Sequence, residues 1–136
     1  DDGAYQVPKG VQEMMQDKVG IAGREAEMRV ALEGIAALWQ RAAKVGVEGN
    51  REFNPGWHTA LDLPNLLTVS EAVTRAALER KESRGGHFRD DYPDKSADWA
   101  KYNLRISKGP DGQPHLERVP VVPLTDDMKQ VIEENK

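Results

Sequence analysis

The sequence predicts a mainly α-helical fold, an antiparallel three-helix bundle followed by a loop-rich tail. Apolar side chains recur at spacings of three and four through residues 1–86, which is the period of a helix with one buried face. After Pro93 this period stops, and prolines, glycines and an Asp-Gly pair become frequent. We therefore expect residues 1–86 to form the bundle. Residues 87–136 are expected to form an extended tail with a β-hairpin and a C-terminal helix, packed on the bundle or on another domain.

The first helix is predicted from a stripe of four apolar residues, Val11, Met14, Met15 and Val19. Pro8 lies near its first turn, where a missing backbone N–H costs little. Gly20 can adopt the left-handed conformation that often ends a helix.

The second helix is expected to run from about Arg24 to Val45, with Gly46 after its end. Its apolar line consists of Met28, Leu32, Ile35, Leu38, Ala42 and Val45. Gly34 lies inside this helix, where glycine costs about 1 kcal/mol relative to alanine. We infer that a neighbouring helix approaches closely at that position.

The third helix is expected to start at Asn54-Pro55, an N-cap followed by a proline in the first helical position, and to end at Gly85. Its apolar positions are Leu63, Leu66, Leu67, Val73, Ala76 and Ala77. Pro64 removes a backbone donor inside this pattern and predicts a kink or break near residues 62–63. Short connections make neighbouring helices antiparallel, so the bundle should resemble a spectrin repeat.

The tail is predicted to contain a hairpin, with strands at residues 104–107 and 115–119 around a turn through Gly109 to Gly112. Pro114 confines its strand to an edge of the sheet. Thr125 is placed to cap a short terminal helix, because two aspartates follow it in the first turn. An isolated hairpin is marginally stable in water, so the tail needs a surface to pack on.

Composition excludes several classes of function. A net charge of −4 and a pI near 5.4 provide no electrostatic footprint for nucleic acid. The absence of cysteine excludes disulfides and thiolate chemistry. No apolar run approaches the roughly 18 residues of a spanning helix, and the acidic start is unlike a signal peptide. The chain begins with aspartate and not methionine, which is expected of a piece of a longer protein or of a processed one.

The sequence contains no complete active site. Its three histidines, His58, His87 and His115, are not at metal-ligand spacing, and the adjacent Asp90 and Asp91 alone make a weak cation site. A serine-nucleophile motif, a P-loop and a dinucleotide fingerprint are all missing. The densest group of functional side chains lies in residues 80–93. There, His87 lies among arginines and carboxylates, so it is either a tuned acid or base or part of a loop held by salt bridges.

Several segments resemble the C-terminal helical region of the succinate dehydrogenase and fumarate reductase flavoprotein family. They are Asn54-Pro55-Gly56-Trp57-His58-Thr59-Ala60-Leu61-Asp62-Leu63, Glu71-Ala72-Val73, residues 76–87 with Glu82-Ser83-Arg84-Gly85, Asp90-Asp91-Tyr92-Pro93, Trp99 and Asn103-Leu104. The resemblance covers roughly the whole chain, and the run from Glu82 through His87 and Arg89 is its most specific part. Gly86 stands where family members often carry alanine, and Pro64 where a helix-compatible residue is usual.

The resemblance implies a parent enzyme that oxidises succinate to fumarate, holds FAD in a Rossmann-type domain and passes electrons through an iron–sulfur subunit to a quinone. The family's catalytic residues lie in upstream domains whose motifs are absent here. We therefore expect no catalytic, cofactor-binding or metal-binding residue in this chain, no FAD bound by it and no activity of its own. The resemblance assigns Arg84, His87 and Arg89 to docking against the flavin domain, a task that suits the planar arginine fork.

The expected partners are the FAD-binding domain of the same polypeptide and the iron–sulfur subunit, without nucleic acid and without direct membrane insertion. The expected location is cytoplasmic, peripheral to the inner face of the membrane through the parent complex. Two alternatives stay open: the C-terminal domain of L-aspartate oxidase, which shares a similar segment, and a free-standing helical interaction module. The resemblance leaves open the physiological direction of the reaction and the quinone.

Overall fold

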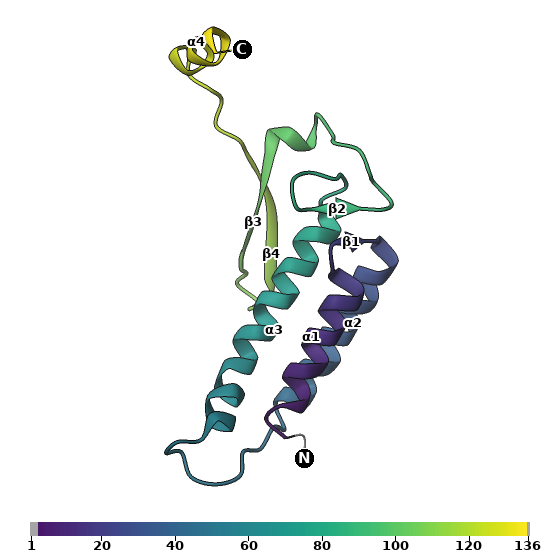
Figure 1. Cartoon of the computed structure of the whole chain (residues 1–136), viewed down its shortest axis with the longest axis vertical. Coiled ribbons are helices and arrows are strands. Elements are labelled where there is room, and N and C mark those ends of the chain that lie inside the picture. The colour runs from purple at the N-terminus through teal and green to yellow at the C-terminus, as the bar shows by residue number, and fades with distance from the viewer. Residues whose placement is uncertain (1–2, 136) are drawn as a thin grey trace.

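The computed structural model describes residues 3–135. Three helices, α1 (Gln6–Val19), α2 (Glu25–Ala42) and α3 (Pro55–Glu79), lie side by side, and successive helices run in opposite directions (Figure 1). A hairpin of β3 (Tyr102–Lys108) and β4 (Pro114–Pro120) follows, and then helix α4 (Asp126–Glu134). The predicted fold class, a helical bundle with a hairpin-containing tail, is therefore confirmed.

The hydrophobic core lies along the centre of the bundle. Each of the three helices contributes two buried residues to it, namely Val7, Val11, Ile35, Leu38, Leu63 and Leu67. Burying an aliphatic side chain of this kind stabilises a fold by about 1.5–3 kcal/mol. The close approach predicted at Gly34 is confirmed, because the sulfur of Met14 occupies the space that a side chain at this position would need.

Helix α3 begins as predicted. The side chain of Asn54 accepts hydrogen bonds from the backbone N–H groups of Gly56 (3.0 Å) and Trp57 (3.4 Å). The break expected at Pro64 does not occur, since the helix continues through it to Glu79. Pro64 is exposed while Leu63 and Leu67 are buried, so packing on one face holds the helix together despite the missing hydrogen bond.

The helix also ends earlier than predicted, at Glu79 and not at Gly85. Arg80 already has an extended backbone, with ψ of 99°. The loop from residue 80 to residue 98 then folds back over the ends of the helices (Figure 1). Its residues Phe88–Arg89 form β2, which pairs in parallel with β1 (Ala22–Gly23) between α1 and α2. This two-residue pairing was not expected from the sequence.

The hairpin is longer than predicted, and its register pairs Tyr102 with Pro120 and Lys108 with Pro114. Trp99, in the short 3-10 helix before β3, is buried at 8% exposure. The guanidinium of Arg118 lies 4.1 Å from the centre of the Trp99 ring and also pairs with Glu79 of α3 at 2.6 Å. The bundle therefore supplies part of the surface on which the hairpin packs.

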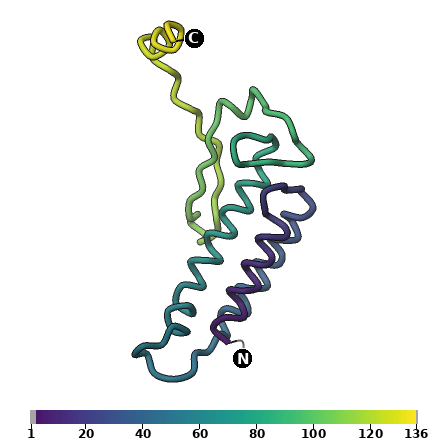
Figure 2. Tube along the Cα trace, in the orientation of Figure 1, coloured from purple at the N-terminus to yellow at the C-terminus, as the bar shows by residue number. Residues whose placement is uncertain are grey.

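Beyond Pro120 the chain leaves the body of the molecule and carries α4 away from it (Figure 2). All residues from 121 to 135 are exposed. Within the described residues, no helix is long and apolar enough to cross a membrane. The division into two domains at residue 86 stays a prediction.

Replacing Pro64 with alanine should restore one helical hydrogen bond without changing the core. We expect Pro64→Ala to raise the free energy of unfolding by about 1–3 kcal/mol. Urea denaturation of the two proteins measures this change. Pro55→Ala is the matched control and should bring no gain, because proline is favourable at the first helical position. A loss of stability in Pro64→Ala would contradict this account of the helix.

Candidate functional site

The side chain of Arg89 is fully buried beneath the end of α3. Its Nη1 donates to the backbone carbonyls of Ala77 (2.9 Å), Leu78 (3.1 Å) and Arg80 (3.4 Å). The last carbonyls of a helix have no partner within it, and the helix dipole favours a cation at this end. Arg89 therefore caps α3 with a charged side chain that comes from ten residues further along the chain.

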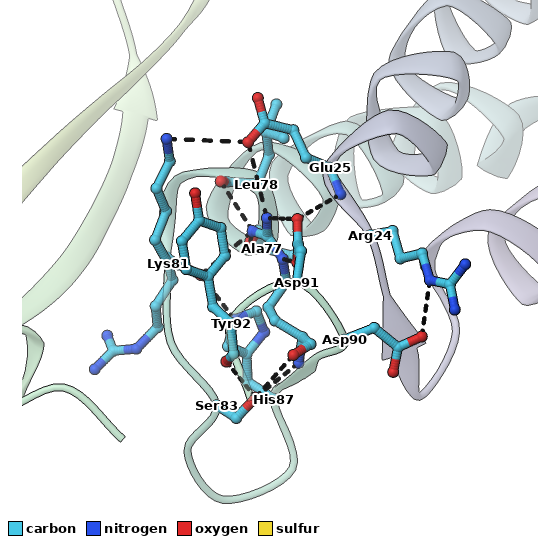
Figure 3. A network of polar contacts seen from close by, with 12 residues as sticks. Arg24, Glu25, Ala77, Leu78, Lys81, Ser83, His87, Asp90, Asp91 and Tyr92 are labelled. Carbon is cyan, nitrogen blue, oxygen red and sulfur yellow. Dashed lines mark hydrogen bonds and ion pairs between the residues drawn. The ribbon is translucent and has the colours of Figure 1, made fainter. Parts of the chain in front are cut away.

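Asp91 links this cap to the neighbouring helix. Its two carboxylate oxygens accept hydrogen bonds from Nε and Nη2 of Arg89, each at 2.7 Å. One of them also accepts from the backbone N–H of Glu25, the first residue of α2, at 3.0 Å (Figure 3). The Arg89–Asp91 pair therefore joins the C-terminus of α3 to the N-terminus of α2. The hydrogen bonds from Arg89 are the main reason that the pKa of Asp91 falls to about 2.

Ser83 holds the loop in place around Arg89. Its hydroxyl accepts from the backbone N–H of Arg89 and donates to the carbonyl of Tyr92, each at 2.8 Å. The Tyr92 ring lies 5.0 Å from the Arg89 guanidinium, at cation–π distance. On the other side, the backbone N–H of Asp90 donates to the carbonyl of Gly23. These contacts close the loop around the buried arginine (Figure 3).

Glu82 forms a second buried charge cluster. Its carboxylate is fully buried and accepts from Arg80 (2.9 Å), from Arg84 (3.0 Å) and from the backbone N–H of Ser96 (2.8 Å). The hydrogen bond from Arg84 is the largest cause of its lowered pKa, about 2, while burial acts in the opposite direction. Glu82 thus ties both arginines to the segment that precedes the hairpin.

Arg84 and His87 belong to a tight turn with Gly85 at φ +60°. Their backbones exchange two hydrogen bonds, at 2.8 and 3.1 Å. Nε2 of His87 lies 3.0 Å from the carbonyl of Arg80, and because a carbonyl can only accept, this nitrogen carries the proton. The side chain of Arg84 remains 37% exposed. The turn therefore presents its glycines and part of Arg84 to the outside.

The structure thus brings the three residues that were singled out, Arg84, His87 and Arg89, into one loop, but it gives them different surroundings. Arg89 points inward, whereas Arg84 and His87 are partly exposed. Sequence reasoning weighed Asp91 only as part of a weak cation site and assigned no role to Glu82, although these are the two acceptors of the network. Their alternation with arginines over residues 80–91 is the signal that could have indicated them.

The N-termini of two helices, which could otherwise attract an anion, are hydrogen-bonded by this chain's own side chains. Asp91 accepts from the first residue of α2, and Asn54 caps α3. In the part of the chain that the structure describes, no three His, Cys, Asp or Glu side chains gather in a way that could hold a metal. A cavity of about 830 Å³ lies between α2, α3 and the hairpin tip, with Leu32, Trp39 and Ala72 among its lining residues. Glu71, Arg75 and Lys108 also line it, so this groove is only partly apolar.

Comparisons with known proteins agree with this picture. The family model described as "Fumarate reductase flavoprotein C-term" matches residues 9–132. This chain belongs to the succinate dehydrogenase and fumarate reductase flavoprotein family. It corresponds to the family's C-terminal domain, as the resemblance indicated.

Individual relatives within the family show what share of a full-length flavoprotein subunit this chain matches. The fumarate reductase flavoprotein subunit of Haemophilus influenzae is 33% identical over 79% of this chain and 18% of its own length. The succinate dehydrogenase flavoprotein subunit of Coxiella burnetii is 34% identical over 70% of this chain and 16% of its own. The chain therefore spans less than a fifth of these curated relatives.

Solved structures of the family have the same fold. Sdh1 of Mycobacterium smegmatis in complex with UQ1 matches with a TM-score of 0.88 and 43% identity, over 98% of this chain and 23% of that one. The E. coli quinol fumarate reductase flavoprotein, FrdA, matches with a TM-score of 0.82 at 23% identity, which establishes the fold alone.

Removing the Arg89 side chain should be among the most damaging substitutions in this domain. Arg89→Ala leaves three helix carbonyls without their donor and removes the ion pair to Asp91, and we expect a loss of about 2–4 kcal/mol in the free energy of unfolding. Arg89→Lys should recover only part of it, because an ammonium cannot hold the carboxylate and the carbonyls at once. Chemical denaturation measures both. The control is Arg29→Ala, which removes an ion pair on the surface of α2 and should lower the free energy of unfolding by less than about 1 kcal/mol. Equal losses in Arg89→Ala and Arg29→Ala would refute the capping role.

The domain should lose stability in acid because of Glu82 and Asp91. Both pKa values are lower in the folded chain, at about 2, than their ordinary values of 4.5 and 3.8. A carboxyl group whose pKa is lower in the folded chain stabilises the fold at pH values above its ordinary pKa. This stabilisation is lost as the pH falls toward the pKa in the folded chain. The free energy of unfolding should therefore decline from about pH 5 down to about pH 2.

Denaturation curves at a series of pH values measure this decline. Glu82→Gln should lower stability near neutral pH and make the decline shallower, whereas the exposed Glu52→Gln should leave the slope unchanged. An unchanged slope in Glu82→Gln would show that the buried carboxylate does not titrate in this range.

Proposed function

We propose that this chain is the structural C-terminal domain of a flavoprotein subunit that interconverts succinate and fumarate. The observation that carries the proposal is the 43% identity to Sdh1 over 98% of this chain. In the parent protein, FAD would supply the two-electron chemistry, and the electrons would pass to an iron–sulfur subunit and a quinone. We propose that the parent acts in electron transport and the tricarboxylic acid cycle.

The FAD would be held by the parent protein outside this domain. A relative from Methanocaldococcus jannaschii, 33% identical over 95 residues, is named an FAD-dependent oxidoreductase. The N-termini of α2 and α3 are already capped by Asp91 and Asn54, which leaves less room for a phosphate group at these two helix ends. The same fold occurs in adenylylsulfate reductase at 23% identity with a TM-score of 0.78. The bundle itself therefore does not determine the substrate.

Docking to the flavin-binding domain is the role that we propose for the loop around Arg84, His87 and Arg89. Arg84 and His87 are partly exposed and can contact another domain directly. Arg89 would act from beneath, because its buried guanidinium fixes the shape of the loop. Gly85, Gly86 and Phe88 are exposed on the same loop, and Phe88 is 42% exposed. A rigid loop with a small, partly apolar outer surface suits a permanent domain contact.

The proposed partners are the flavin-binding domain of the same polypeptide and the iron–sulfur subunit of the complex. A solved structure of the Mycobacterium smegmatis Sdh1 complex, 45% identical over 93% of this chain, supports a multi-subunit parent. We propose a cytoplasmic position, peripheral to the inner face of the membrane, reached through the parent complex.

Flavin binding tests this division of labour. We expect the isolated chain to fold and to bind no FAD in a titration followed by flavin absorbance and fluorescence. The coding sequence upstream of Asp1 should contain a dinucleotide-binding fingerprint. Stoichiometric flavin binding by this chain, or succinate oxidation by it alone, would overturn the proposal. A gene without any upstream flavin-binding sequence would favour a free-standing helical module.

Gly86→Glu tests the docking surface. A side chain at Gly86 meets no other atom within 4 Å, and the residue has no left-handed backbone, so the isolated chain should keep its melting temperature. In the parent flavoprotein the same change should weaken docking and lower the flavin retained after gel filtration. Gly46→Glu is the matched control: it lies beyond the C-terminal end of α2, whereas the loop contacts the N-terminal end of that helix, and a side chain there also meets no atom within 4 Å. Equal flavin retention in the two variants would argue against this loop as the docking surface.

A further inference from the structure

Helix α4 has an apolar face that this chain does not cover. Met128, Val131 and Ile132 lie at spacings of three and one, which places them on one side of the helix, and Leu124 comes just before its N-cap. Their exposed fractions are between 49% and 58%. The other side carries the charged and amide residues Asp126, Asp127, Lys129, Gln130, Glu133 and Glu134. Val122, in the segment that leads to the helix, is 84% exposed.

A helix of this length needs a partner. Isolated helices shorter than about 12–15 residues are marginal in water, and α4 has nine residues. Its side-chain contacts include the pairs Lys129–Asp126 and Gln130–Glu134, which are exposed and local. Such pairs contribute little, so the apolar face must be buried against something for the helix to persist.

The tail is directed away from the groove on the chain's own bundle (Figure 2). That groove involves Gly112, Gln113 and Pro114 at the tip of the hairpin. The tail leaves from Pro120, at the opposite end of β4, which at about 3.3 Å per residue is about 20 Å away. The backbone N–H of Val121 still donates to Lys101, so the five-residue connection starts from a fixed point and leads away from the groove (Figure 2).

The comparisons indicate where the partner lies. The family model extends to residue 132 and so includes most of α4. The match to Sdh1 covers 98% of this chain, and the tail is far longer than the remaining 2%. The tail therefore belongs to the part that this chain shares with a much longer polypeptide, of which the chain matches only 23%. The apolar face of α4, which is exposed in this domain, can therefore be covered by the larger part of such a polypeptide that lies outside the match.

We infer that residues 121–135 are a strap that binds across an apolar groove on the flavin-binding part of the same parent polypeptide. Four carboxylates against one lysine in α4 require basic side chains along the edges of that groove. This inference rests on the proposed function, since it needs a longer parent chain. It goes further because it assigns a second contact, separate from the one at the Arg84 turn, to the boundary between this domain and the flavin-binding part.

Hydrogen exchange in the parent flavoprotein tests the strap. Peptides covering residues 121–135 should exchange at least about tenfold more slowly in the parent than in this chain alone. Met128→Asp with Val131→Asp in the parent should restore fast exchange. Gln130→Asp is the matched control, because it adds the same charge to the polar side of the helix and should leave the protection intact. Equal exchange of these peptides in the parent and in the isolated chain would overturn the inference.

Cross-linking from Lys129 identifies what covers the helix. Links to upstream residues of the same polypeptide support the strap. Links to another subunit or to a second copy overturn it, as would dimers of this chain alone in sedimentation. Flavin content and succinate-dependent dye reduction are measured on the same preparation. A protected tail in a parent without these activities would support the strap and refute the proposed function, so the two failures can be told apart.

Discussion

The architecture depends on one ion pair, between the buried Arg89 and the partly exposed Asp91, that joins two helix ends. The guanidinium satisfies the last carbonyls of α3, and the carboxylate satisfies an N–H at the start of α2. The end of one helix carries partial negative charge and the start of the other partial positive charge. A single hydrogen-bonded pair therefore neutralises both and sets the distance between α2 and α3 at this end of the bundle.

The pair is also well suited to hold the loop. Burying a charge is costly unless it is paired and fully hydrogen-bonded, and both conditions are met here. In the described residues, no buried side-chain nitrogen or oxygen lacks a hydrogen-bond partner. Glu82 is the centre of a second cluster of this kind, where it holds Arg80 and Arg84. The buried charged groups Glu82 and Arg89 each have specific partners, which makes the loop rigid and its outer face suitable for docking.

The three helices could be predicted from the sequence because their signals are local. Apolar periodicity, the Asn54 cap and the glycine at position 34 each depend on residues within a few turns. The early end of α3 could not be predicted, since it depends on Arg89, ten residues beyond that end. The pairing of β1 with β2 joins residues 22 and 88, and no local pattern marks a two-residue strand. Pro64 shows the opposite case, in which a strong local signal is overridden by packing on the buried face of the helix.

The three candidate residues lie on one loop, and their role in docking stays a prediction. A concentration of arginines on a loop suggests recognition of something outside the chain. Arg89 instead faces inward and binds the chain's own helix end, because unpaired carbonyls at a helix terminus attract a guanidinium as a ligand's carboxylate would. Since this guanidinium is already engaged within the chain, the surfaces that we propose for contacts with other domains are the exposed part of the turn and the apolar face of α4.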